Sequence, residues 1–419
     1  MSLVSTLFSD SFSPLKDRNY RIYIIGQAIS LIGTFMQQVA QQWYVWDITH
    51  DSRWIGIVGA CAFVPLVLLS PITGSIADRV DRRKLLLTTQ ITEMTLAFML
   101  GILALSGARE IWPILILAVL LGITAAFNFP AQGAFIGDLS GMGEIRKAVA
   151  FNVTMIETGR LIGPALAGLV VDRVGTGTAF MLNGLSFVAV IISLFLVRSQ
   201  QIVRAATGSP LGNFVEAVRF IRKTPRIIDL LLCSLLVMLF VFSSLQLSAP
   251  IADDILKGGP RLVGYMLAAS GAGALLASLF LAPQLQKVPR AGLVLLLALL
   301  WSGAWLIIMS FFRSAPLTLL GIFMYSINIP VVLGSVNSLT QLLAPGNMRA
   351  RVLSASQMLS FAAQPLGALF VGWSANAFDP LTAIRINGVL MVMLVLAFLA
   401  LRPAYRQWRV ERAPQTTPH

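Results

Sequence analysis

The stretch Gly74-Ser75-Ile76-Ala77-Asp78-Arg79-Val80-Asp81-Arg82-Arg83-Lys84 decides the fold of this chain. It places four cationic side chains and two carboxylates between two long apolar runs. Charges at this density are too costly to place in hydrocarbon, so the stretch marks the point where one apolar helix leaves a membrane and the next one enters it. The flanking sequence therefore predicts membrane-spanning helices.

Two roles are open for this charged connection. In the first, Gly74 lets its helix approach a neighbour closely, and Asp78 accepts hydrogen bonds from the positive N-terminal end of another helix. In the second, Arg79, Arg82 and the two cations that follow only determine which end of the helices faces the cytoplasm. Because topology alone does not require Gly74 or Asp78, the sequence favours the first role.

The composition excludes most other classes of protein. Hydrophobic residues make up 57% of the chain and charged residues 12%, which is typical of a polytopic membrane protein and not of a soluble domain. The net charge of +13 does not indicate nucleic-acid binding, because the cations lie between apolar runs with no aromatic and basic platform around them.

The scarcity of nucleophiles and metal ligands argues against an enzyme. Cys61 and Cys233 lie inside apolar runs, and the two histidines are His50 and His419. We therefore expect no disulfide, no metal site and no cofactor. The sequence also lacks a phosphate-binding loop of the Gly-x-x-x-x-Gly-Lys-Ser/Thr type, which argues against ATP as the energy source.

Apolar segments of about 20 residues or more recur along the chain and predict twelve spans. They cover residues 21–44, 54–76, 85–106, 112–135, 149–171, 178–197, 228–250, 262–282, 291–311, 315–343, 352–373 and 381–401. The longest connection carries Leu211, Phe214, Val218 and Ile221 at helical spacing, which predicts an amphipathic helix on the inner membrane surface. The predicted domains are an N-terminal six-helix bundle (1–197), this linker (198–227), a C-terminal six-helix bundle (228–401) and a cytoplasmic tail (402–419).

The two bundles resemble each other. Matches at constant offsets pair Arg53 with Arg261, Gly56 with Gly264, and Asn128-Phe129-Pro130 with Asn328-Ile329-Pro330. The matched positions fall in topologically equivalent helices, which predicts a duplicated six-helix unit. Most Lys and Arg residues gather in alternate connections, on the side of the two termini, and this predicts that both termini lie in the cytoplasm.

Two motifs resemble those of the major facilitator superfamily of transporters. The spacing Gly-x-x-x-Asp-Arg-x-x-Arg-Arg-Lys from Gly74 to Lys84 resembles the loop between helices 2 and 3 of that superfamily. The stretch from Gly159 to Gly168 resembles the helix 5 signature of its exporters. The resemblance covers nearly the whole chain and implies an all-α integral membrane protein with 12 transmembrane helices in two parallel six-helix repeats. It points to the drug and siderophore efflux branch, and within it to the macrolide-efflux and enterobactin-exporter group.

Polar residues inside the predicted spans are candidates for substrate binding. Gln27, Thr34, Gln38 and Gln41 fall on one side of the first helix, and such a stripe faces protein or water and not lipid. Hydrogen bonding between helices is the alternative explanation for the stripe.

The resemblance extends this candidate site to other helices, because helices 1, 4, 7 and 10 line the central cavity of the superfamily. It implies that the cavity is lined by Asn128, Gln246, Asn328 and Ser335, with Ser243, Ser244, Phe240 and Trp43 nearby. These mostly uncharged groups suit a large amphiphilic or neutral polar solute better than a simple anion.

Three charged residues inside the spans are candidates for proton coupling. Glu93 and Glu157 would each cost roughly 2.5 to 3.5 kcal/mol or more as charges exposed to hydrocarbon, so we expect them to be protonated, paired or hydrated. Arg160 lies three residues after Glu157 and can pair with it, which leaves a static pair and a proton switch as equal alternatives. Glu93 has no evident local partner, which favours a titrating role.

The remaining candidates concern gating. Gly159, Gly163 and Ala167 form a small-residue seam and Pro164 permits a bend, with generic helix packing as the less favoured explanation. The superfamily pattern implies that in the outward-facing state Asp78 hydrogen-bonds near Val352 and pairs with Arg82, which Asp138 contacts on its other side. Gly74 and Arg79 complete the predicted gate.

The predicted function is proton-driven export of a small amphiphilic compound, a drug or a siderophore, by alternating access. Import or symport by the same fold and lipid flipping are the rival functions. The expected partners are a small-molecule substrate, protons and the lipid bilayer of a bacterial inner membrane. We expect the protein to be a monomer that binds no nucleic acid.

Overall fold

The computed structural model describes residues 13–197, 210–285, 288, 290–346, 348–402, 405 and 408. Within the helices it leaves the side chains of residues 75, 78, 141–143, 146, 210, 211 and 283 undescribed. Every regular element in the described ranges is helical. Eleven helical stretches in these ranges are long and apolar enough to cross a membrane.

The N-terminal half begins with the short helix η1 (Ser13–Lys16). It continues with α2 (Arg18–Thr49), α3 (Ser52–Arg79), α4 (Arg82–Leu105) and α5 (Ile111–Leu196). The side chains of Asp17, Asp51 and Asp81 cap the starts of α2, α3 and α4, and each accepts a hydrogen bond from a backbone N–H of the first turn. The short polar connections therefore begin the next helix directly.

The helix α5 is one continuous helical run that contains three spans. Its stretch Lys147–Leu196 has 50 residues. A straight helix of that length would extend about 75 Å, more than twice the thickness of a bilayer core. Contacts with α2 show where the chain turns back. From residue 159 to residue 163 the contacts move toward the C-terminal end of α2, whereas from residue 183 to residue 193 they move toward its N-terminal end. Gly175, with φ at 85°, lies between them, so the described helices make the twelve predicted spans.

The C-terminal half is more often interrupted. Its seventh span consists of α7 (Pro225–Leu236), the π-helix η2 (Val237–Phe242), η3 (Leu245–Leu247), α8 (Ser248–Pro250) and the π-helix η4 (Ile251–Ile255). The other spans are α9 (Gly259–Leu276) with η5 (Ala277–Leu281) and α10 (Ala282–Leu285), then α11 (Ala291–Met309), α12 (Ala315–Ser326) with α13 (Asn328–Leu343), α14 (Arg349–Phe361) with α15 (Ala363–Ala377), and α16 (Pro380–Leu401).

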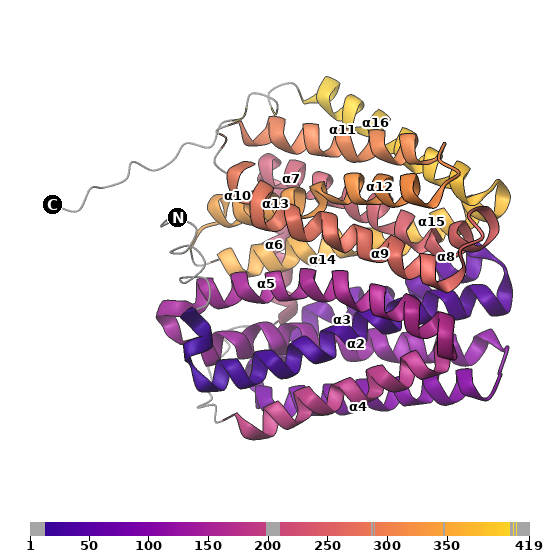
Figure 1. Cartoon of the computed structure of the whole chain (residues 1–419). Coiled ribbons are helices and arrows are strands. Elements are labelled where there is room, and N and C mark those ends of the chain that lie inside the picture. The colour runs from indigo at the N-terminus through magenta and orange to yellow at the C-terminus, as the bar shows by residue number, and fades with distance from the viewer. Residues whose placement is uncertain are drawn as a thin grey trace, which may run out of the picture.

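The two halves lie side by side, with the earlier helices below and the later helices above in Figure 1. We call the end that carries the loop at residues 79–84 the basic end, and the end that carries the α2–α3 turn at His50 the far end. The spans run roughly parallel between these two ends (Figure 1).

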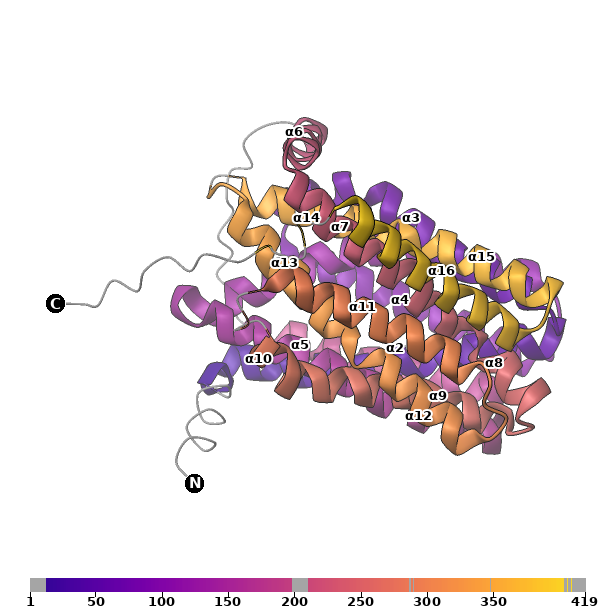
Figure 2. The same ribbon diagram turned by 90° about the horizontal axis from the view of Figure 1, so that it is seen from above.

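The linker helix α6 (Pro210–Lys223) lies across the spans at the basic end (Figure 2). Part of its apolar face packs against protein. Ala217 and Ile221 are buried in a cluster with Val352 and Ala355 of α14. Arg351 of α14 also donates to Glu216 of α6 at 3.1 Å.

Hydrophobic packing differs between the two ends of the molecule. The largest cluster contains residues of both halves, but its N-terminal members come only from residues 36–61, 96–121 and 167–180, which lie toward the far end. At the basic end the N-terminal half has a cluster of its own around Tyr20, Phe135 and Leu194. The halves therefore share a core at the far end and have separate cores at the basic end.

Candidate functional site

The charged connection contains a buried ion pair. Nη1 of Arg82 donates to both carboxylate oxygens of Asp138, at 2.7 Å each, and the two side chains are 9% and 11% exposed. The structure thus confirms the predicted contact of Asp138 with Arg82. Arg79 is exposed at the end of α3, and the side chain of Asp78 lies outside the described residues.

The close approach expected at Gly74 is absent, so that prediction is wrong for this conformation. A Cβ added at Gly74 would meet no atom within 4 Å, and the same holds for Gly133 and Gly137 near the basic end. Although α6 and α14 both contact α3, no atom of either lies close enough to Gly74 to require a glycine there. Close approaches of α3 occur at Gly56 and Gly59 near its other end.

Four glycines form two helix crossings at the far end. A Cβ at Gly264 of α9 would lie 2.5 Å from the carbonyl oxygen of Pro164 and 2.6 Å from Cα of Gly168, both in α5. Helices α3 and α15 cross in the same way, with Gly56 of α3 packed against Gly372 and the carbonyl oxygen of Ala368 in α15. Since Gly56 and Gly264 are the matched positions of the sequence repeat, the repeat builds both crossings between the halves.

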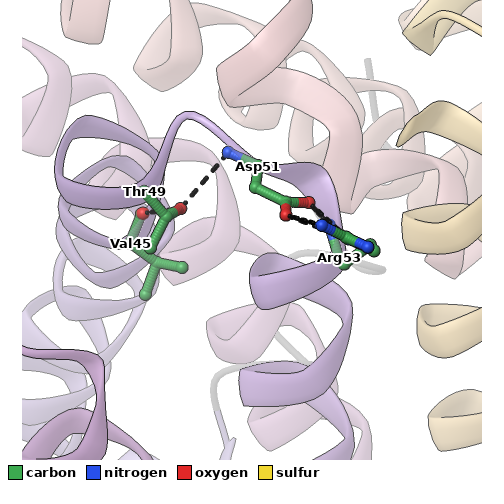
Figure 3. A network of polar contacts seen from close by, with 4 residues as sticks. All are labelled: Val45, Thr49, Asp51 and Arg53. Atoms are coloured by element: carbon green, nitrogen blue, oxygen red, sulfur yellow. Dashed lines mark hydrogen bonds and ion pairs between the residues drawn. The ribbon is translucent and has the colours of Figure 1, made fainter.

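The turn between α2 and α3, whose residues Ser52 and Arg53 lie against Gly372, carries a network of polar contacts (Figure 3). The backbone of His50 has a left-handed conformation. The hydroxyl of Thr49 donates to the carbonyl of Val45 at 2.6 Å and accepts from the backbone N–H of Asp51. The guanidinium of Arg53 donates to both oxygens of Asp51. Partial burial raises the pKa of Asp51, but the hydrogen bonds and the charge of Arg53 outweigh it and hold the pKa below its ordinary value.

Polar side chains add to the contact between the halves at the far end. Trp46 of α2 donates from Nε1 to Asp253 of the seventh span at 3.0 Å. Gln42 donates to the carbonyls of Leu245 and Gln246, at 3.0 and 2.6 Å. The side chain of Gln246 also packs closely on Gly59, because a Cβ added at Gly59 would lie 2.6 Å from Oε1 of Gln246.

The polar stripe of the first span divides among several environments. The side chain of Gln38, one helical turn before Gln42, is exposed. In contrast, Gln27 is 5% exposed and Gln41 is half-buried. The hydroxyl of Thr34 donates to the carbonyl of Ser30. Only part of the stripe is therefore open to a ligand in this conformation.

The other predicted cavity residues are mostly turned into the helix packing. Asn328 and Ser335 of α13 are 7% and 8% exposed. Ser243 and Ser244 are fully buried, and Asn387 of α16 donates to both of their hydroxyls. Asn387 also donates to the carbonyl of Phe240 in the π-helix η2, so these groups lie inside the C-terminal half.

Adjacent glutamines of α2 allow binding and packing to be separated. Gln38→Leu removes an exposed donor and acceptor, so we expect it to change substrate affinity with little change in protein abundance. Gln37 is buried and accepts from Asn183 at 2.7 Å, so Gln37→Leu leaves a buried amide unpaired and should lower stability by about 1 to 3 kcal/mol. Ligand binding and thermal unfolding of both variants measure this difference. Equal loss of abundance in both variants would favour the packing alternative for the stripe.

Glu93 has a partner that the sequence did not reveal. Nδ2 of Asn128 donates to Oε1 of Glu93 at 3.1 Å, and Gln90 donates to Oδ1 of Asn128 at 3.3 Å. Asn128, predicted to bind substrate, thus holds a carboxylate between α4 and α5. No cation of the described residues pairs with Glu93 at ion-pair distance.

Arg160 lies where α5 meets the opposite half. Its guanidinium pairs with Glu157 at 3.4 Å and stacks on Phe35 of α2 and Phe242 of η2, with ring centres 5.7 and 5.6 Å away. The backbone of Arg160 packs on Gly271 of α9.

The small-residue seam contacts a different helix. Gly159 and Gly163 pack on α2, near Leu31, Phe35 and the carbonyl of Ile32, whereas Pro164 faces α9. Hence α5 presents one small-residue face to its own half and a second face to the other half.

Several residues of the site are missed by sequence reasoning. Four of them make the contacts between the halves described above, namely Gln42, Trp46, Phe242 and Asp253, and Phe35 stacks on Arg160 within the N-terminal half. The only signal for Gln42 was its place in a glutamine-rich helix, since it lies outside the narrow stripe. The aromatic residues cannot be distinguished by sequence from the many others in apolar spans.

Comparison with known families decides the class of the protein. The profile of a family described as transmembrane secretion effector matches residues 9–416. The chain belongs to this family of the major facilitator superfamily. It is a multi-pass membrane transporter of small molecules, and not an enzyme.

Relatives of this chain include other transporters. The staphyloferrin A transporter of Staphylococcus aureus (strain NCTC 8325 / PS 47) is 27% identical over 377 residues, which cover 88% of this chain and 92% of that protein. Macrolide efflux protein A of Streptococcus pyogenes is 23% identical over 276 residues, 65% of this chain and 68% of that protein. The solved nucleoside transporter NupG shares the fold, with a TM-score of 0.73 at 13% identity, over 92% of this chain and 99% of that one.

Proposed function

We propose that this transporter exports a small amphiphilic compound from the cytoplasm by alternating access and that protons drive the export. The shared far-end core, with its two glycine crossings, carries the proposal, because closure at one end and separation at the other is one of the two states that alternating access requires. With the basic end in the cytoplasm, this state is open inward. Two relatives, a macrolide efflux protein and a staphyloferrin A transporter, support the solute class.

Everted membrane vesicles test the direction of transport. In such vesicles the cytoplasmic face is outside, so an exporter accumulates its solute when the lumen is made acidic. A labelled macrolide and staphyloferrin A are suitable first solutes. Accumulation that requires the opposite proton gradient would indicate an importer, and transport of labelled phospholipid with neither solute would indicate a flippase.

Glu93 is the proposed proton carrier, because it lies inside a span with one amide donor and no paired cation among the described residues. Glu93→Gln keeps the shape and the contact with Asn128 but carries no proton. We expect gradient-driven accumulation to fall to the level of empty vesicles while solute binding is retained. The matched control is Glu110→Gln, which neutralises an exposed carboxylate in a loop and should leave transport unchanged. Unchanged accumulation in Glu93→Gln would exclude Glu93 as the carrier.

A further inference from the structure

Arg160 is a mid-membrane cation with unused hydrogen-bonding capacity. Its guanidinium has five N–H donors, yet it makes no side-chain hydrogen bond to any of the described residues. Its ion pair with Glu157 is 3.4 Å long, well beyond the roughly 2.7 to 2.9 Å of a charge-assisted hydrogen bond. The side chain is 24% exposed, so part of this group is accessible to a ligand.

Glu157 is equally poorly satisfied. Its side chain is 11% exposed, and its Oε2 is buried without a hydrogen-bond partner. A buried charge normally gains two or more hydrogen bonds in compensation for the water it loses. The pair therefore does not resemble a structural ion pair such as Arg82 with Asp138, where one nitrogen contacts both oxygens at 2.7 Å.

The aromatic rings around Arg160 hold the guanidinium plane without using its donors. Phe35 comes from the N-terminal half and Phe242 from the C-terminal half, where the π-helix η2 ends. Cation–π stacking orients a guanidinium and leaves its N–H edge free for a planar anion. Phe242 belongs to the opposite half, so this arrangement depends on contact between the two halves.

We propose that Arg160 binds the carboxylate of an amphiphilic anionic substrate, with Glu157 occupying that position when no substrate is bound. A guanidinium matches a planar carboxylate with two parallel hydrogen bonds, and the present occupant is itself a carboxylate. The flanking rings provide apolar surface for the rest of the molecule. This assignment rests on the proposed export function, and it adds a single negative group to the expected amphiphilic solute.

Binding to the purified full-length protein in lipid nanodiscs tests the assignment separately from transport. The probes are N-dansyl-phenylalanine, an amphiphilic carboxylate, and its uncharged amide, both followed by dansyl fluorescence. The wild-type protein should bind the acid more tightly than the amide. Arg160→Gln should weaken binding of the acid roughly tenfold to a hundredfold, the size of a lost hydrogen bond to a charged group, and leave the amide unchanged.

Two further variants distinguish anion binding from a structural role. Glu157→Gln removes the internal competitor and should tighten binding of the acid but not of the amide. Arg160→Lys should restore part of the preference for the acid, since it keeps the charge and loses the planar fork. The assignment is overturned if the wild-type protein does not bind the acid more tightly than the amide. It is also overturned if Arg160→Gln weakens binding of both probes equally and Glu157→Gln does not tighten binding of the acid. Export that persists without any preference for the acid would overturn this assignment alone and leave the proposed export function intact.

Discussion

Replacing Gly264 with valine is expected to abolish transport in a protein that still folds. Even the first side-chain atom would lie 2.5 Å from the carbonyl oxygen of Pro164 and 2.6 Å from Cα of Gly168. Both are backbone atoms of α5, which cannot move aside as a flexible side chain can. The clash exists only when the far end is closed, so a cost of about 3 kcal/mol would shift the two states roughly a hundredfold toward the one open at the far end.

Cysteine labelling from the far side measures this shift. In a background without Cys61 and Cys233, a cysteine at Gln246 should react with an impermeant maleimide in Gly264→Val but not in the parent. Gly133→Val is the matched control, because an added Cβ there meets nothing within 4 Å. Protection of position 246 in the Gly264 variant would show that the glycine crossing does not control closure.

Arg82→Gln should have the second large effect, on stability as well as transport. The substitution leaves the carboxylate of Asp138 buried without its cation, and such a loss typically costs about 3 to 5 kcal/mol. We expect a lower midpoint of thermal unfolding in detergent and a corresponding loss of transport. The double variant Arg82→Gln with Asp138→Asn should recover part of the stability, because it removes both buried charges.

Lys84→Gln is the control for the topology alternative. Lys84 is an exposed cation in the same connection, so its loss removes as much positive charge as the loss of Arg82 without breaking a buried pair. If the two variants lose abundance to the same extent, the loop serves mainly as a topology signal. A larger loss in Arg82→Gln supports a role for its contact with Asp138.

Hydropathy and charge were sufficient to predict the spans and their division into halves. The transfer cost of polar residues acts on each segment separately, so the boundaries can be found without knowing any neighbour. The pair of Glu157 with Arg160 was also predictable, because residues three apart share a helix face.

Contacts between helices were harder to predict. The motif around Gly74 predicted a close helix–helix contact there, but the close contacts between the halves are at Gly56 and Gly264. In the sequence these two glycines were notable only as matched positions of the repeat. Glu93 appeared isolated because its partner Asn128 is 35 residues away, on another span. The ring of Phe242 meets Arg160 only because the two halves close together, and nothing local in the sequence specifies that closure.

The docking of α6 has a counterpart in the N-terminal half. In the N-terminal half, Ser13 of η1 donates to Glu144 at 2.9 Å, next to the connection between the fourth and fifth spans. In the C-terminal half, Glu216 of α6 accepts from Arg351, next to the connection between the tenth and eleventh spans. Each half is thus preceded by a helical segment that contacts the equivalent connection. In its place before the first span of its half, and in the connection that it contacts, α6 is the counterpart of η1.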